Sequence, residues 1–141
     1  MCEGPVPRRT PSSLRPRGRA GRGPWLRYRD VPGLSGAANA AVRVLERDRM
    51  TPGVVCVALS VWSVRVHGTV RRWRPWEAEF TCPCCGGGWA RDRLQEALAR
   101  LPPRAAAELR VRVERLDDVL LRRTHHEPAS DPESAWWHRR C

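Results

Sequence analysis

The chain has 141 residues and a formal net charge of +11, which fits one small domain with tails and would ordinarily favour an anionic partner. All 26 basic residues are arginine, and lysine and isoleucine are absent; because the scarce residue types have A/T-rich codons, a GC-rich genome explains much of this charge without selection for nucleic-acid binding. No apolar stretch could span a bilayer, and the N-terminus lacks the apolar run of a signal peptide, so we expect a cytoplasmic protein. In that reducing compartment the six cysteines are expected to be metal ligands or buried thiols rather than disulfides.

Residues 1–29 are predicted to form a disordered basic arm. They contain eight arginines, several prolines and glycines and few large apolar side chains, so they cannot bury enough surface to offset chain entropy. The run from Arg15 to Gly23 is similar to arginine-glycine segments that follow nucleic acid backbones, and a GC-rich genome can also produce such a run.

A helix is predicted between Ser35 and Met50. Ser35 is a candidate N-cap, and Thr51-Pro52-Gly53 should end the helix. The apolar residues that fall on one face of it are Leu34, Ala38, Ala41, Val42 and Leu45.

A short antiparallel sheet is predicted to follow. Residues 54–59 are an apolar, β-branched run typical of a buried strand, and apolar and polar residues alternate over 62–67. Gly68 is expected to turn the chain into a strand over 69–73, and residues 77–80 alternate again. These strands would form a β-meander that leads into a cluster of cysteines.

The segment Cys82-Pro83-Cys84-Cys85-Gly86 has the pattern of a zinc knuckle. Thiolates at the spacing of Cys82 and Cys85 can bind one zinc ion at about 2.3 Å. The proline stiffens the turn, and the glycine lets the backbone fold back toward sulfur. The pattern therefore predicts half of a structural zinc site.

Two further ligands must complete this site, because structural zinc is nearly always tetrahedral. His138 and Cys141 are the first candidate pair, since their spacing allows both to face one ion. Cys84 is a competing thiol, and Cys56 with His67 is a second candidate pair.

A thiol redox protein that uses Cys82 and Cys85 is an alternative interpretation. A redox thiolate is stabilised at the N-terminus of a helix that continues directly through the second cysteine. Here Gly86-Gly87-Gly88 separates the cysteines from the next helical pattern, which argues against redox catalysis.

Alternating guanidinium and indole groups precede the cysteines and are candidates for nucleic-acid binding. Such groups can pair with phosphates and stack on unpaired bases. On a strand the same arginines could be solvated while the tryptophans pack against helices. The candidate residues are Arg71, Arg72, Trp73, Arg74 and Trp76.

A helical hairpin is predicted after the three glycines, with Pro102-Pro103 between its helices. The apolar stripe of the first helix is Leu94, Ala97, Leu98 and Leu101, and that of the second is Ala106, Leu109, Val113, Leu116 and Leu120. Asp117 and Asp118 are expected to lie at least partly outward and to solvate the second helix. Residues 125–141 form a polar tail with an aromatic end.

Two resemblances concern the second half of the chain. The stretch from Leu94 to Arg104 resembles the opening helices of region 4 of bacterial sigma factors, which precede a promoter-reading helix-turn-helix. This chain instead continues as one amphipathic helix through residues 116–120. Residues 73–124 resemble small uncharacterised proteins of GC-rich actinobacteria, a similarity that implies no particular activity.

The predicted architecture is an α+β domain over residues 30–124, flanked by the arm (1–29) and the tail (125–141). A short antiparallel sheet would carry the zinc knuckle at its edge and the helical hairpin on one face. The predicted function is that of a non-enzymatic zinc-binding accessory protein that binds nucleic acid or a nucleoprotein. The alternatives are the thiol redox protein and a protein-binding adaptor, related to transcription, that acts through the helical hairpin.

Overall fold

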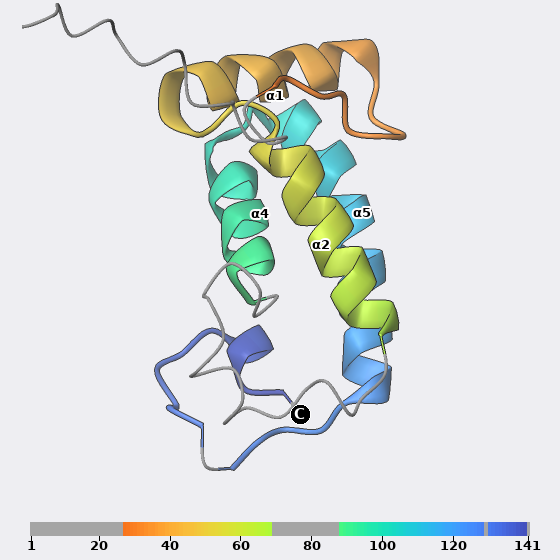
Figure 1. Cartoon of the computed structure of the whole chain (residues 1–141), viewed down its shortest axis with the longest axis vertical. Helices are drawn as coiled ribbons and strands as arrows, with labels where there is room; N and C mark the ends of the chain where they lie inside the picture. Colours follow the sequence, from red (N-terminus) through yellow and green to blue (C-terminus); the bar gives the residue numbers. More distant parts are fainter. Residues whose placement is uncertain (1–26, 69–87, 129, 141) are drawn as a thin grey trace, which may run out of the picture.

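The computed structural model describes residues 27–68, 88–128 and 130–140, which form four α-helices and one 3₁₀ turn (Figure 1). In chain order these are α1 (Gly36–Arg49), α2 (Val54–His67), α4 (Gly88–Arg100), α5 (Pro103–Arg123) and η3 (Trp136–His138). Within the described ranges there is no sheet, and the strand pairing is limited to an isolated antiparallel bridge between His126 and Arg140. The predicted α+β class with an antiparallel meander is therefore wrong.

Helix α1 begins and ends where the sequence predicts. The Ser35 hydroxyl oxygen accepts a hydrogen bond from the backbone N–H of Ala38 at 3.1 Å, which confirms Ser35 as the N-cap. The helix buries Ala38, Val42 and Leu45. After Met50 the chain turns through Gly53, whose φ of 80° favours glycine, and enters α2.

Helix α2 occupies the segment that the sequence analysis assigned to strands over 54–59 and 62–67. The prediction failed because the apolar residues of this segment fit both the period of a strand and the period of a helix. The segment forms a helix because that conformation buries one apolar stripe in the core. The residues that α2 buries completely lie three or four positions apart, and they are Val55, Ala58, Trp62 and Val66. Packing of this stripe outweighs the modest helix penalty of β-branched residues. The strands predicted over 69–73 and 77–80 lie outside the described residues.

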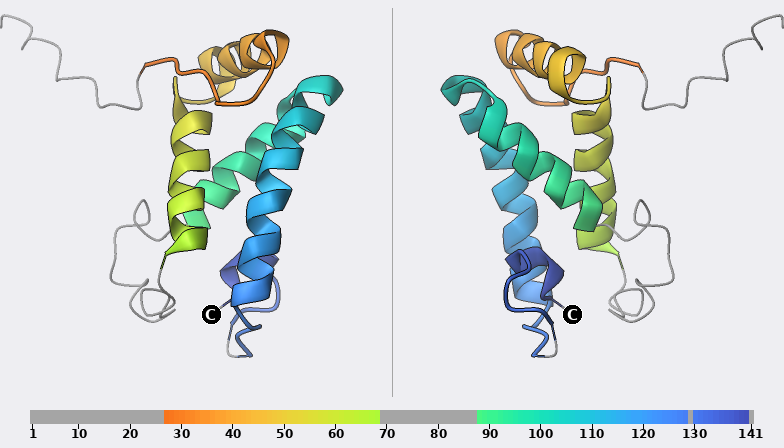
Figure 2. Two further views of the ribbon diagram at one scale, coloured as in Figure 1. Left: turned by 90° about the vertical axis from the view of Figure 1, so that its right-hand side faces the viewer. Right: turned by 90° about the vertical axis from the view of Figure 1, so that its left-hand side faces the viewer.

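The helical hairpin of α4 and α5 forms as predicted, but it packs on α2 rather than on a sheet (Figure 1). The chain reverses at Leu101 and Pro102, and α5 then runs unbroken to Arg123. Helix α1 lies across one end of the other three helices (Figure 2).

No single helix of the described ranges is long and apolar enough to span a membrane. Helices α1 and α2 together reach that length and composition, but they are bent by 106° at their junction.

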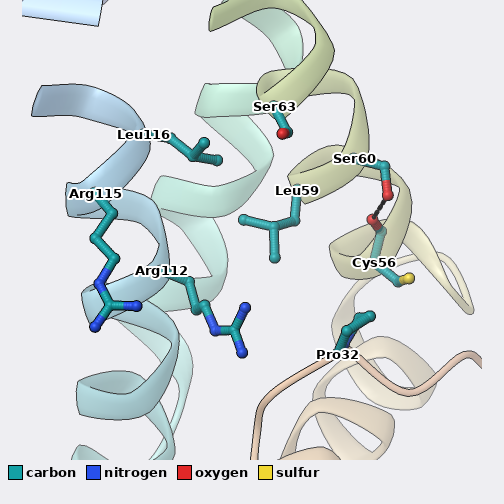
Figure 3. Close-up of a pocket in the computed structure, with 8 residues that line it drawn as sticks. All are labelled: Pro32, Cys56, Leu59, Ser60, Ser63, Arg112, Arg115 and Leu116. Carbon is teal, nitrogen blue, oxygen red and sulfur yellow. Dashed lines mark hydrogen bonds between the residues drawn. The ribbon is translucent and has the colours of Figure 1, made fainter. Parts of the chain in front are cut away.

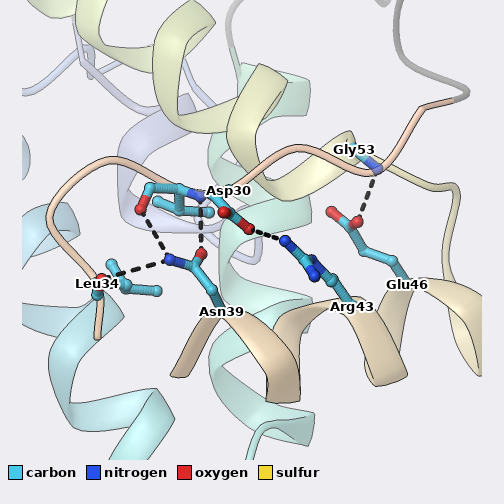
Figure 4. A network of polar contacts seen from close by, with 7 residues as sticks. Asp30, Leu34, Asn39, Arg43, Glu46 and Gly53 are labelled. Atoms are coloured by element: carbon cyan, nitrogen blue, oxygen red, sulfur yellow. Dashed lines mark hydrogen bonds and ion pairs between the residues drawn. The ribbon is translucent and has the colours of Figure 1, made fainter. Parts of the chain in front are cut away.

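The loop before α1 is fastened to that helix by the side chain of Asn39 (Figure 4). Its Oδ1 accepts from the backbone N–H of Val31 at 2.8 Å, and its Nδ2 donates to the carbonyl oxygens of Val31 and Leu34 at 3.4 and 3.3 Å. Arg43 pairs with Asp30 at 2.6 Å on the exposed side of the same loop. These contacts hold Val31 in the core, where it is 1% exposed.

Glu46 of α1 caps the start of α2 (Figure 4). Its carboxylate oxygens accept from the backbone N–H groups of Gly53 at 2.7 Å and Val55 at 2.9 Å, which satisfies two of the unpaired donors of the α2 N-terminus. The side chain is fully buried. Burial raises the pKa of Glu46, and the hydrogen bonds from Gly53 and Val55 oppose that shift.

Candidate functional site

An ion pair between Arg91 and Asp117 joins three helices inside the bundle. Arg91 lies in the first turn of α4, and its Nη2 is 2.9 Å from Oδ2 of Asp117 on α5. Its Nε also donates to both carboxylate oxygens, at 3.1 and 3.0 Å. The indole N–H of Trp62, on α2, donates to Oδ1 of Asp117 at 3.0 Å. Asp117 is 6% exposed, so the expectation that it lies outward is wrong.

The C-terminal tail docks on this ion pair through Trp137. The guanidinium carbon of Arg91 lies 4.3 Å from the centroid of the Trp137 ring, a cation–π contact. The Trp137 indole N–H donates to Oδ1 of Asp92 at 2.8 Å. Trp136 packs edge-on against Trp137 with ring centroids 5.7 Å apart. The start of α4 therefore serves as the docking point of the tail.

His138 lies at the same place and contacts Asp92 and Gly88. Its Nε2 is 2.9 and 3.1 Å from the two carboxylate oxygens of Asp92. In a neutral imidazole, a carboxylate at Nε2 favours the tautomer that carries the proton there and leaves the lone pair on Nδ1. A Cβ atom at Gly88 would lie 2.5 Å from Cε1 and 2.6 Å from Nδ1 of His138. The imidazole thus fits in this position because residue 88 has no side chain.

Arg140 anchors the end of the tail to the end of α5. Its Nη2 donates to the carbonyl oxygens of Leu121 at 3.0 Å and Thr124 at 2.5 Å, and its Nε donates to the Thr124 hydroxyl at 3.1 Å. The three carbonyl and hydroxyl acceptors lie at a helix C-terminus, where a cation is favoured. The tail is consequently held at two points, Trp137 with His138 and then Arg140.

The structure separates one of the two predicted ligand pairs and leaves the other untested. Cys56 and His67 are eleven positions apart on α2, which is about 16 Å along a helix, so they cannot bind one ion. Nδ1 of His67 instead contacts the carbonyl oxygen of Ser63 at 2.8 Å. Burial raises the pKa of the Cys56 thiol, which makes it a poor candidate for a reactive thiolate.

The other predicted ligands and the predicted nucleic-acid residues lie mainly outside the described part of the chain. Of the remaining predicted metal ligands, His138 is described, and the ones outside are Cys82, Cys84, Cys85 and Cys141. The nucleic-acid candidates outside are Arg71, Arg72, Trp73, Arg74 and Trp76, so their role stays a prediction. Among the described residues, no three histidine, cysteine or acidic side chains converge as a metal site.

Sequence reasoning missed Asp92 as the partner of His138 and Asp117 as the partner of Arg91. The first pair has no sequence signal, because the two residues are far apart in the chain. The second pair had a sequence signal, because Asp117 lies four residues after Val113 and three before Leu120, on the apolar stripe of α5.

Comparisons with protein-family models, curated proteins and solved structures found no match for this chain.

Proposed function

We propose that this protein is a non-enzymatic zinc-binding accessory protein in which Nδ1 of His138 is a ligand of a structural zinc ion. The remaining ligands in this proposal are Cys82, Cys85 and Cys141, with Cys84 as a competing thiol. The observation that carries the proposal is the orientation of His138, which hydrogen-bonds Asp92 through Nε2 and turns Nδ1 toward Gly88.

The contact between His138 and Asp92 has the form that zinc-binding histidines commonly adopt. A ligating imidazole usually donates its second N–H to a carboxylate, which fixes its tautomer and orientation and raises its basicity as a ligand. Asp92 is placed to accept such a hydrogen bond, and its Oδ1 also accepts from the Trp137 indole N–H. As a bare surface pair the contact would contribute little, because both side chains are about 40% exposed (39% and 42%).

The covalent chain also supports the proposal. Gly86 and Gly87 separate Cys85 from Gly88, so the Cα atoms of Cys85 and Gly88 can be at most about 10 Å apart. In this proposal the Cys85 thiolate is near the same end of α4 as the His138 imidazole. Cysteine and histidine together are the donor set that structural zinc prefers.

A bound zinc ion would tie the cysteine segment before α4 to the C-terminal tail after α5. Binding of structural zinc contributes directly to folding free energy. We therefore expect the tail contacts at Trp137 and His138 to be weaker in the metal-free protein.

Competition for zinc against a chromophoric chelator, with the full chain under reducing conditions, tests the role of His138. We expect zinc affinity to fall by at least about tenfold in His138→Ala and by about 10–100-fold in Asp92→Asn. His67→Ala is the matched control, since that exposed histidine lies on α2, where its Nδ1 contacts the Ser63 carbonyl oxygen. Unchanged affinity in His138→Ala would show that His138 is not a ligand.

A further inference from the structure

A groove between α2 and α5 is open beside the loop at Pro32 (Figure 3). Its volume is about 440 Å³, which lies within the range of pockets that hold a ligand or a few side chains. Leu59 of α2 and Leu116 of α5 form its apolar part, and both pack against the core. Arg112 and Arg115 of α5 form its charged side. The groove thus combines an apolar floor with two cations.

The two arginines differ from most of their counterparts in having no described partner. Within the described ranges, no hydrogen bond or ion pair involves Arg112 or Arg115, whereas Arg91 and Arg43 each pair with an aspartate. Arg112 lies directly over Gly33, where a Cβ atom would overlap its guanidinium group. The absence of a side chain at Gly33 therefore leaves room for the Arg112 guanidinium beside the groove.

An exposed apolar side chain, that of Val64, lies next to the groove on α2. Val64 lies one turn after Ser60, which lines the groove, and it is 75% exposed. Helix α2 is apolar on nearly all sides, a composition typical of a helix that is covered all round. In the described structure α2 contacts α1, α4 and α5, and Val64 is its one exposed large apolar side chain. This valine beside the groove is suited to contact an apolar side chain of a partner.

We infer that this groove binds an acidic amphipathic segment of another protein. An apolar side chain of that segment would rest on Leu59 and Leu116, and neighbouring aspartates or glutamates would pair with Arg112 and Arg115. Guanidinium groups bind carboxylates in a bidentate manner, which gives such pairs both strength and direction. The net charge of +11 would also attract an acidic partner.

The basic arm of this chain does not have the chemistry of that partner. Residues 1–26 contain six arginines and a single acidic residue, so the two groove arginines would repel them. Binding of an acidic segment at this groove also does not require the zinc ion, because the groove residues lie on α2 and α5. The two proposals can therefore fail separately.

Selection of peptides from a randomised 12-residue phage library against the full-length protein tests this inference. We expect the enriched peptides to carry aspartate or glutamate beside a large apolar residue. Synthetic versions, measured by fluorescence anisotropy, should bind at least about tenfold more weakly to Arg112→Gln/Arg115→Gln. They should also lose affinity when their apolar residue is replaced by serine.

Arg104→Gln/Arg122→Gln is the matched control, because both of its arginines are exposed on the same helix and it removes the same charge. Peptide affinity should be nearly unchanged in this control. Failure to enrich acidic peptides, or an equal loss in both double variants, would overturn the inference. Binding of a single-stranded oligonucleotide that depends on Arg112 and Arg115, with no acidic peptide bound, would overturn it in favour of a nucleic-acid surface.

Discussion

Arg91 and Asp117 form an ion pair whose side chains are only 7% and 9% exposed. Burying two charges is costly unless their hydrogen-bonding groups are satisfied. Here Trp62 donates to the carboxylate, Gln95 accepts from Arg91 Nη1 at 3.0 Å, and the Trp137 ring covers the guanidinium. The pair therefore fixes the positions of α2, α4 and α5 and provides the surface on which the C-terminal tail docks.

Asp117→Asn should destabilise the protein strongly. The substitution keeps the shape of the side chain but leaves the buried Arg91 charge without a counter-ion, which typically costs about 3–5 kcal/mol. Asp118→Asn is the control, since that neighbour is exposed and should change the free energy of unfolding by less than about 0.5 kcal/mol. Urea unfolding followed by circular dichroism measures both. Equal effects of the two substitutions would contradict the role given to the buried pair.

Glu46 should give the stability a distinct pH dependence. Because its pKa in the folded protein is raised, the native state holds this proton more tightly than the unfolded state does. The stability contributed by the protonated carboxyl is present below the ordinary pKa of 4.5 and is lost as the pH rises through the raised value. The slope can reach at most about 1.4 kcal/mol per pH unit.

The comparison with Glu46→Gln isolates this slope from that of carboxyl groups whose pKa is lowered in the folded protein. The pKa of Glu108, for example, is lowered by hydrogen bonds from the Ser35 backbone and side chain. From pH 4.5 upward, the free energy of unfolding of the wild type should fall relative to that of Glu46→Gln. Parallel stability curves for the two proteins would contradict the raised pKa.

Substitution of two nearby glycines by alanine should have opposite effects. Gly33 has φ of +84°, where an alanine is strained by about 1–2 kcal/mol, and its new methyl group would also displace Arg112. Gly36 is the first residue of α1 and has open space around its Cβ position, so alanine there should stabilise by about 0.4–1 kcal/mol. Thermal unfolding of both variants checks this. A stabilised Gly33→Ala protein would contradict the described loop.

The sequence predicted the helices whose signals are local and unambiguous. The Ser35 cap, the Pro102-Pro103 break and the amphipathic stripes of α4 and α5 define those elements without reference to the rest of the chain. Helix α2 was missed because alternation at Trp62, Val64 and Val66 also fits a strand. Only the tertiary arrangement, in which Trp62 and Val66 face α4 and α5 while Val64 remains exposed, shows that the period is that of a helix.

The candidate site was predictable only in part, for a related reason. His138 stands out in the sequence through its spacing to Cys141, but its contacts with Asp92 and Gly88 depend on how the tail folds back on α4. The groove between α2 and α5 could not be predicted either, since its residues were assigned to a strand and a helix. Pairs that lie far apart in sequence need a correct fold before they can be recognised.

Zinc content of the full-length protein, purified under reducing conditions, tests the central proposal most directly. We predict about one equivalent of zinc per chain, and loss of both the metal and thermal stability in the Cys82→Ala/Cys85→Ala variant. Cys56→Ala, which alters a cysteine on α2, should keep its zinc and serves as the control. Full zinc retention by Cys82→Ala/Cys85→Ala, or wild-type protein that binds no zinc and melts identically with and without a chelator, would contradict the proposal.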